Sequence, residues 1–396
     1  MSTENAEKTS LSSKEYILFL VSTLPVMAGA TIAPALPEIA KAFPDESELS
    51  IQLILTITAL FTAIGSLFVG NIIDKFGRRR PYIISIILYG VSGSSGLYLN
   101  SVGAILVSRA ILGIAVAGVM TISITLVGDY YSGEFRNKIV GLQASFMTFG
   151  GVIFIFFGGV LAEIDWHLPF AIYLISFIFM IGVILRLDEP KRLLEISTVN
   201  AVSEHEHSIK AHKGVLLFAY SLGFITVMLF YFIIIFLPFY LEEKFNKSPT
   251  DIGLALSINS LFAGIASLTY KRLKSKYHYH ALFGLLFIFM TLGSLIISVA
   301  SSFEVLLLGL VTFGVGIGMF IPSINSWLFG QTHAPIRGRI IGGFTAFLFL
   351  GQFISPIVGN AILEITNVPG LLRFAALIYM VFAISFFVTA YFKDKT

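Results

Sequence analysis

Arg109 is the only charged residue well inside one of the long apolar runs of this sequence, the run 102–127. Counted from Val102 at 1.5 Å per residue, it lies about 10–12 Å into that run. A charge at such a depth is by default a hypothesis of a functional site. A guanidinium there could also extend towards the surface and be purely structural, as long basic side chains often do.

Glu38 is the acidic residue best placed to act with Arg109, because no Asp or Glu lies deep in any apolar run. It follows Pro37 at the end of the first run and could face the same interior. If it approaches Arg109, its pKa will respond to the local environment and to substrate. The alternative is a carboxylate at a helix end on the surface. We therefore name Arg109 and Glu38 as candidates for proton coupling or substrate binding, and we expect no catalytic residue and no metal site.

Polar residues inside the other apolar runs are the best guide to a cavity. Many hydroxyls simply bond to the backbone of their own helix, so each alone is more often structural. Amide side chains are harder to bury without a partner. The candidates for lining a cavity are Thr31, Gln52, Thr56, Gln143, Tyr231, Asn259, Asn325, Trp327 and Gln352.

The segment 70–83 carries five charged residues within seven positions, between two apolar runs. Such a cluster cannot stay in hydrocarbon, and its basic residues predict a tight loop at the cytoplasmic surface of a membrane. Gly70 would allow close helix approach and Gly77 would supply a turn. Plain topology-setting charge would explain the arginines but not the spacing of the other residues. The candidate conformational latch comprises Gly70, Asp74, Gly77, Arg78 and Asp129.

Composition places the chain in a membrane. Of its 396 residues, 56% are hydrophobic and 12% are charged, whereas soluble domains carry about 25% charged residues. The net charge of +3 does not suggest nucleic-acid binding, and the absence of cysteine excludes disulfides and thiolate metal sites. No nucleotide-binding loop or catalytic triad is recognisable, so neither ATP-driven transport nor a membrane enzyme is expected, and no cofactor is expected.

The apolar runs predict an all-α membrane protein with twelve transmembrane helices. If both termini are cytoplasmic, Lys41, Lys244, Lys247 and Arg373 are the only basic residues in outer loops, which fixes the orientation. The predicted spans are 16–37, 51–73, 82–99, 102–127, 139–161, 168–187, 215–240, 251–270, 281–300, 303–328, 340–362 and 371–392.

A polar linker and an internal repeat divide the chain into two halves. The linker contains His205, His207 and His212, which could bind metal, although a solvated linker is the favoured interpretation. A shift of 201 residues superposes Gly113 on Gly314 and Glu163 on Glu364, among other matches. The linker and the repeat therefore predict two pseudo-symmetric six-helix bundles with a substrate site between them. The predicted units are a cytoplasmic tail 1–15, a bundle 16–187, a cytoplasmic linker 188–213, a second bundle 214–392 and a tail 393–396.

Three segments resemble motifs of the major facilitator superfamily, and the resemblance extends over nearly the whole chain. The loop Gly-x-x-x-Asp-Lys-x-Gly-Arg-Arg-x-Pro at 70–81 resembles its signature loop, which implies a latch that holds the halves together. The run around Arg109 resembles its fourth-helix motif, which implies proton transfer or substrate binding. The segment 31–39 resembles the first-helix end of its bacterial drug/proton antiporters. The fifth-helix antiporter motif is incomplete, because Phe154 and Ile155 replace a Gly-Pro step.

These features predict a proton-coupled secondary transporter that exports a small amphipathic compound, neutral to anionic, by alternating access. Such efflux is typical of multidrug resistance. The alternatives are an importer of a sugar or organic anion and, from another class, a non-transporting sensor or scaffold. The expected partners are a small-molecule substrate, protons and membrane lipid, without nucleic acid. We expect a monomer in the cell membrane, that is, a bacterial cytoplasmic membrane.

Overall fold

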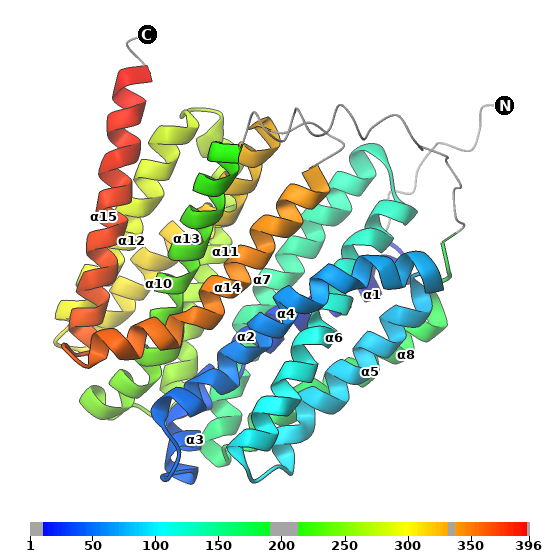
Figure 1. Ribbon diagram of the computed structural model, residues 1–396, viewed down its shortest axis with the longest axis horizontal. Helices are drawn as coiled ribbons and strands as arrows, with labels where there is room; N and C mark the ends of the chain where they lie inside the picture. The colour runs from blue at the N-terminus through cyan, green and yellow to red at the C-terminus, as the bar shows by residue number, and fades with distance from the viewer. Residues whose placement is uncertain (1–10, 191–212, 332–336, 394–396) are drawn as a thin grey trace.

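The computed structural model describes residues 11–190, 213–331 and 337–393, and every regular element in these ranges is helical (Figure 1). The first half contains α1 (Ser13–Val21), α2 (Leu24–Ala30), η1 (Ala33–Ala35), α3 (Leu36–Ala42), α4 (Glu48–Phe76), α5 (Arg79–Ser94), η2 (Ser95–Leu97), α6 (Val102–Tyr130), α7 (Gly133–Ile164), η3 (Leu168–Leu174) and α8 (Ile175–Arg186). The second half contains α10 (Lys213–Phe245), α11 (Pro249–Lys274), α12 (Tyr279–Val299), α13 (Phe303–Gln331), α14 (Arg337–Leu363) and α15 (Val368–Lys393).

Eleven helical segments in the described ranges are long and apolar enough to cross a membrane. The predicted span 82–99 corresponds to α5 and η2, which together run from Arg79 to Leu97. The α-helical part has 16 residues, slightly below the roughly 17–25 that a spanning helix needs. The histidines of the predicted linker lie outside the described residues, whereas Asp188–Pro190 at its start are described.

The first predicted span is broken into four short helices by its prolines. Pro25, Pro34 and Pro37 each fall in the first turn of a new helix, because proline has no backbone N–H to donate within a continuing helix. The hydroxyl of Tyr89 donates a 2.7 Å hydrogen bond to the Leu24 carbonyl oxygen next to the first break. A side chain of α5 is therefore hydrogen-bonded to the backbone at the start of α2.

Residues related by the internal repeat form equivalent close helix contacts in the two halves. A Cβ on Gly113 of α6 would lie 2.4 Å from the Thr58 carbonyl oxygen, and one on Gly314 of α13 would lie 2.5 Å from the Asn259 carbonyl oxygen. Both pairs are related by 201 residues. Only glycine permits this approach of two helix backbones, so the repeat seen in the sequence specifies equivalent helix crossings.

The two halves meet along two pairs of helices, α4 with α14 and α7 with α11. α10 begins and α15 ends at one face of the molecule, at the top in Figure 1, which we call the termini face; the other end is the closed face. The helices of the two halves diverge towards the termini face (Figure 1). Accordingly, nothing lies within 4 Å of a Cβ on Gly70, Gly141 or Gly342, which lie towards that face.

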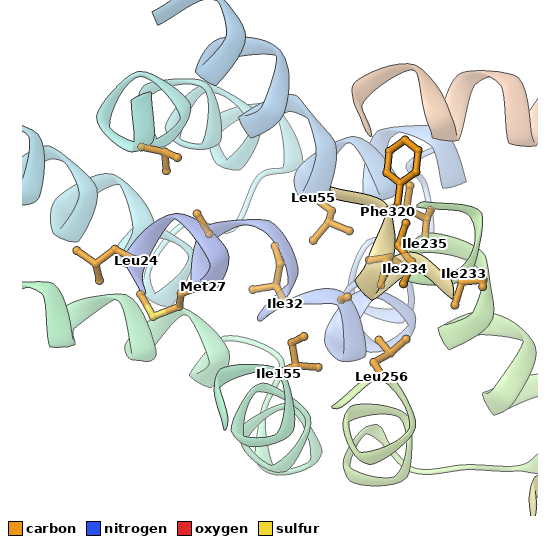
Figure 2. Packing of buried hydrophobic residues seen from close by; sticks show 14 of the residues in the cluster. Leu24, Met27, Ile32, Leu55, Ile155, Ile233, Ile234, Ile235, Leu256 and Phe320 are labelled. Carbon is orange, nitrogen blue, oxygen red and sulfur yellow. The ribbon is translucent and has the colours of Figure 1, made fainter. Parts of the chain in front are cut away.

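Contacts between the halves are concentrated at the closed face. The Asn360 amide of α14 donates a 2.6 Å hydrogen bond to the Gln52 side-chain oxygen of α4. Gly159 of α7 and Gly253 of α11 bring their backbones together, since a Cβ on Gly159 would lie 3.0 Å from the Cα of Gly253. Figure 2 shows buried apolar side chains of both halves around this region, including Ile32, Leu55, Ile155, Ile234, Leu256 and Phe320.

Candidate functional site: a cavity between the halves

A cavity of about 390 Å³ lies at the seam between the two halves. Each half contributes four helices to its wall: α2, α4, α6 and α7 from the first, and α10, α11, α13 and α14 from the second. Its volume falls in the range of roughly 300–1,000 Å³ that is typical of small-molecule sites. The polar residues of the lining are Thr58, Thr62, Thr148, Tyr231, Asn259, Ser260 and Gln352.

None of the described residues that line this cavity carries a charge. The remaining wall is apolar and includes Met120 and Met147 from the first half and Phe230 and Phe349 from the second. Methionine and aromatic side chains adapt to ligands of varied shape and contribute large contact areas. The arrangement is suited to holding a small, largely apolar molecule by contact and by a few hydrogen bonds.

Three of the nine predicted lining residues, Tyr231, Asn259 and Gln352, form part of this wall. Gln143 instead lines a neighbouring pocket of about 180 Å³, where its amide donates a 2.5 Å hydrogen bond to the Ser22 hydroxyl. This side pocket shares Pro25, Met120 and Met147 with the central cavity, so it extends the cavity along α7 rather than forming a separate site.

The other five predicted lining residues lie elsewhere. Thr31 is buried and its hydroxyl donates to the Met27 carbonyl oxygen, 2.7 Å away. Gln52 forms the contact with Asn360 at the closed face, and Thr56 is fully buried. Trp327 packs edge-on against Phe218 and Phe283 within the second half. Asn325 has a buried side-chain oxygen without a partner, on α13 but outside the cavity lining.

Arg109 is fully buried inside the first half, away from the cavity lining. Its guanidinium carbon lies 4.6 Å from the ring centre of Phe170 and 4.8 Å from that of Tyr173, both on η3. One terminal nitrogen donates a 3.4 Å hydrogen bond to the Gly93 carbonyl oxygen of α5. The guanidinium thus joins α6 to α5 and η3 by cation–π contacts and one hydrogen bond, and Nε and Nη1 have no partner among the described residues.

The structure does not bring Glu38 and Arg109 together. Glu38 contacts Lys41, whose ammonium is 2.9 Å away, and the same ammonium also pairs with Glu242 at the end of α10. No carboxylate contacts Arg109 in the part of the chain that the structure describes. Glu38 therefore lies at the closed face, where Lys41 connects α3 of the first half to α10 of the second.

The predicted latch residues gather at the termini face. Arg78 Nε donates to Asp129 Oδ2 at 2.9 Å, and Asp74 lines the same pocket of about 590 Å³. Gly77 ends α4 with a φ of +81°, a value that glycine adopts without strain. The expected close helix approach at Gly70 is not present in this conformation, because the two halves are spread apart at this face.

A profile described as the Major Facilitator Superfamily matches residues 18–218 and again 219–396. The chain belongs to the major facilitator superfamily. It is therefore a multi-pass membrane protein that transports a small molecule, and not an enzyme. The resemblance of the signature loop and of the Arg109 segment is thereby confirmed at the level of the superfamily.

Two curated relatives are each about a quarter identical to this chain, and a solved structure of similar fold is less so. The bacillibactin exporter of Bacillus subtilis is 25% identical over 368 residues, which cover 88% of this chain and 90% of the exporter. The quinolone resistance protein NorA of Staphylococcus aureus is 24% identical over 327 residues, 79% of this chain and 80% of NorA. The solved structure of a D-xylose–proton symporter has a TM-score of 0.79 at 18% identity, covering 94% of this chain and 97% of the symporter.

Two carboxylates, one at the termini face and one at the closed face, were not predicted from the sequence as site residues. Glu189 accepts hydrogen bonds from the backbone N–H groups of Arg78 and Arg79, at 2.6 and 2.8 Å, and so caps the start of α5. Glu163 accepts from the Ser248 hydroxyl and the Thr250 N–H across the seam. The repeat could have drawn attention to Glu163, whereas nothing in the sequence pattern marks Glu189, the second residue of the predicted linker.

Proposed function

We propose that this chain is a proton-coupled secondary transporter that exports a small, uncharged amphipathic molecule by alternating access. The observation that carries the proposal is the uncharged cavity on the seam, lined by four helices from each half. Rocking the halves about this seam would expose the cavity to each side in turn. Two relatives are named for quinolone resistance and for bacillibactin export, which supports export over import.

The proposal includes a twelve-span topology, with α5 and η2 forming the third span. Both termini are placed in the cytoplasm of a bacterial cell, because the basic residues of the segment 70–83 lie at the termini face. The conformation described here then opens towards the cytoplasm, where an exported molecule would enter. The energy source assigned is the proton gradient, since the sequence contains no nucleotide-binding loop.

Within this proposal, the site residues have different tasks. Tyr231, Asn259 and Gln352 contact the substrate. Arg109 is a positioning residue for α5 and η3 during the movement, because its guanidinium contacts both elements and lies outside the cavity lining. Glu38 belongs to the closed face, and Arg78 and Asp129 belong to the latch at the termini face.

Flux into proteoliposomes that contain the purified full-length protein tests this function, with the uncharged probe 7-methoxycoumarin-4-acetamide. An exporter coupled to protons should accumulate the probe when the lumen is acidic, and a protonophore should abolish accumulation. Accumulation only with an alkaline lumen would indicate the alternative, an importer, which the incomplete fifth-helix motif at Phe154 and Ile155 allows. No flux under either gradient, measured against protein-free vesicles, would indicate a sensor or scaffold.

A further inference from the structure

The free hydrogen-bonding groups of the central cavity are not evenly distributed between its two walls. On the first half, the hydroxyl groups already donate to backbone carbonyl oxygens of their own bundle. Thr62 Oγ1 is 2.7 Å from the Thr58 oxygen, and Thr148 Oγ1 is 3.0 Å from the Ala144 oxygen. Thr58 itself donates to the Arg109 oxygen at 3.3 Å. The first half therefore has no unused donor hydrogen among these three hydroxyls.

The second half presents polar groups without partners. The Tyr231 hydroxyl and the Gln352 amide make no side-chain hydrogen bond within the described ranges, although only 6% of Gln352 is exposed. Asn259 donates one N–H to the Leu310 carbonyl oxygen, at 3.0 Å, and its side-chain oxygen has no hydrogen-bond partner among the residues that the structure describes. These polar groups face the cavity, and a ligand that displaces water from them must supply the hydrogen bonds that the water made. They therefore point to a ligand with hydrogen-bonding groups of its own.

Tyr231 and Gln352 also converge in space. A Cβ on Gly29 of α2 would lie 3.5 Å from the Tyr231 hydroxyl oxygen and 3.8 Å from Gln352 Nε2. The Tyr231 hydroxyl from α10 and the Gln352 amide from α14 thus both lie next to Gly29 on the opposite wall. Around that point the first half offers apolar surface from Val26, Met147 and Ile155.

We infer that the cavity binds an uncharged molecule with an apolar body and one edge that both donates and accepts hydrogen bonds, such as a carboxamide or lactam. The edge lies on Tyr231, Asn259 and Gln352 of the second half, and the apolar body lies on the first half. This inference rests on the proposed function and names its substrate class. A cation or anion would lose its hydration without meeting an opposite charge in this lining, so charged molecules are disfavoured.

Binding to the detergent-purified full-length protein tests this inference without requiring transport. Four coumarins share one scaffold: 7-methoxycoumarin-4-acetamide, the 4-acetate, the 4-trimethylammoniomethyl cation and the 4-ethyl compound, which lacks the polar edge. The acetamide should bind at least tenfold more tightly than either charged compound. Equal affinity for a charged member, or no measurable binding of the acetamide up to its solubility limit, would overturn the inference.

Variants then test which wall holds the polar edge. Gln352→Leu and Tyr231→Phe should each weaken acetamide binding about five- to tenfold, and should change 4-ethyl binding less than twofold. Thr148→Val should weaken acetamide binding by a smaller factor than Gln352→Leu does. The control is Thr312→Val, a half-buried position on α13 outside the cavity lining, whose hydroxyl donates to the Leu308 carbonyl oxygen. If Gln352→Leu weakens both compounds equally, the amide does not bind the edge and the inference fails.

The failures of the two proposals are distinguishable. The expected binding pattern without flux in vesicles would contradict the transport proposal and leave the ligand class intact. Proton-driven flux combined with binding that does not depend on ligand charge would contradict the ligand class alone. Unfolding of a variant is recognised by its thermal transition and by loss of binding for the 4-ethyl compound as well.

Discussion

The carboxylate of Glu163 accepts a 3.0 Å hydrogen bond from the Ser248 hydroxyl, and this contact joins the end of α7 to the start of α11. The Thr250 N–H also donates to it, at 3.3 Å, so a residue of one half caps a helix of the other. The repeat pairs Glu364 with Ser47 in the same way. That pair is not formed, because the Ser47 hydroxyl lies 2.8 Å from the Ser50 hydroxyl and the Glu364 side chain has no partner among described residues. The closed face is thus held asymmetrically.

Glu163→Ala should loosen the closed face and favour the conformation that opens there. The chain has no cysteine, so a single cysteine introduced at Ala263 in the cavity wall can report access from that side. We expect its labelling by a membrane-impermeant maleimide to accelerate a few-fold. Glu364→Ala, at the counterpart whose carboxylate has no hydrogen-bond partner in the described ranges, should change the rate less than twofold. Equal acceleration by both variants would mean that the hydrogen bonds of Glu163 do not hold this face.

Gly159→Val should destabilise the conformation described here. A Cβ at this position would lie 2.4 Å from the Pro249 carbonyl oxygen of α11, and such overpacking costs about 1–3 kcal/mol. The labelling assay at Ala263 should show greater access from the closed face, and the thermal transition of the protein should fall. Gly141→Val on the same helix is the control, because nothing lies within 4 Å of its Cβ position. Similar effects at both positions would argue against contact of α7 with α11 as the cause.

Arg109→Met should reduce transport without weakening ligand binding. The guanidinium lies between η3 and α5 and outside the cavity lining, so the dissociation constant of the uncharged coumarin should change less than twofold. The thermal transition should hold or rise, because an unpaired buried charge is removed. Flux should fall at least tenfold. Weaker binding by tenfold would place Arg109 in contact with the substrate, and unchanged proton-driven flux would remove it from the mechanism.

Glu189→Ala should destabilise the start of α5. Its carboxylate caps the first N–H groups of that helix at 2.6 and 2.8 Å, and loss of such a cap costs about 1 kcal/mol. Hydrogen exchange of the first turn of α5 should accelerate by roughly fivefold. Glu46→Ala, in an exposed loop at the other face, serves as the comparison. No change at α5 would show that water replaces the carboxylate without loss.

The sequence predicted the helical membrane fold well, because the lengths of the apolar runs and the 201-residue repeat are patterns that extend over the whole chain. It predicted one continuous first span less well, since Pro25, Pro34 and Pro37 break that span at points that composition alone does not set. Asn259 and Gln352 were identified because buried amides need partners. Thr31 was a less reliable guide, because its hydroxyl bonds within its own helix.

The direction in which Arg109 points could not be read from the sequence. α6 is apolar on every side and is packed against α4, α5 and α2. A helix that is apolar all round has no amphipathic stripe that distinguishes the cavity from the bundle interior. The aromatic neighbours Phe170 and Tyr173 come from η3, some sixty residues further along the chain, and only the fold brings them to the guanidinium.

The absence of charge from the central cavity wall has an electrical consequence. If an uncharged molecule leaves as a proton enters, each cycle moves net charge across the bilayer. Transport would then be electrogenic, and membrane voltage would drive it even at equal pH on both sides. One elementary charge gains about 2.3 kcal/mol per 100 mV, enough to concentrate the exported compound roughly fiftyfold.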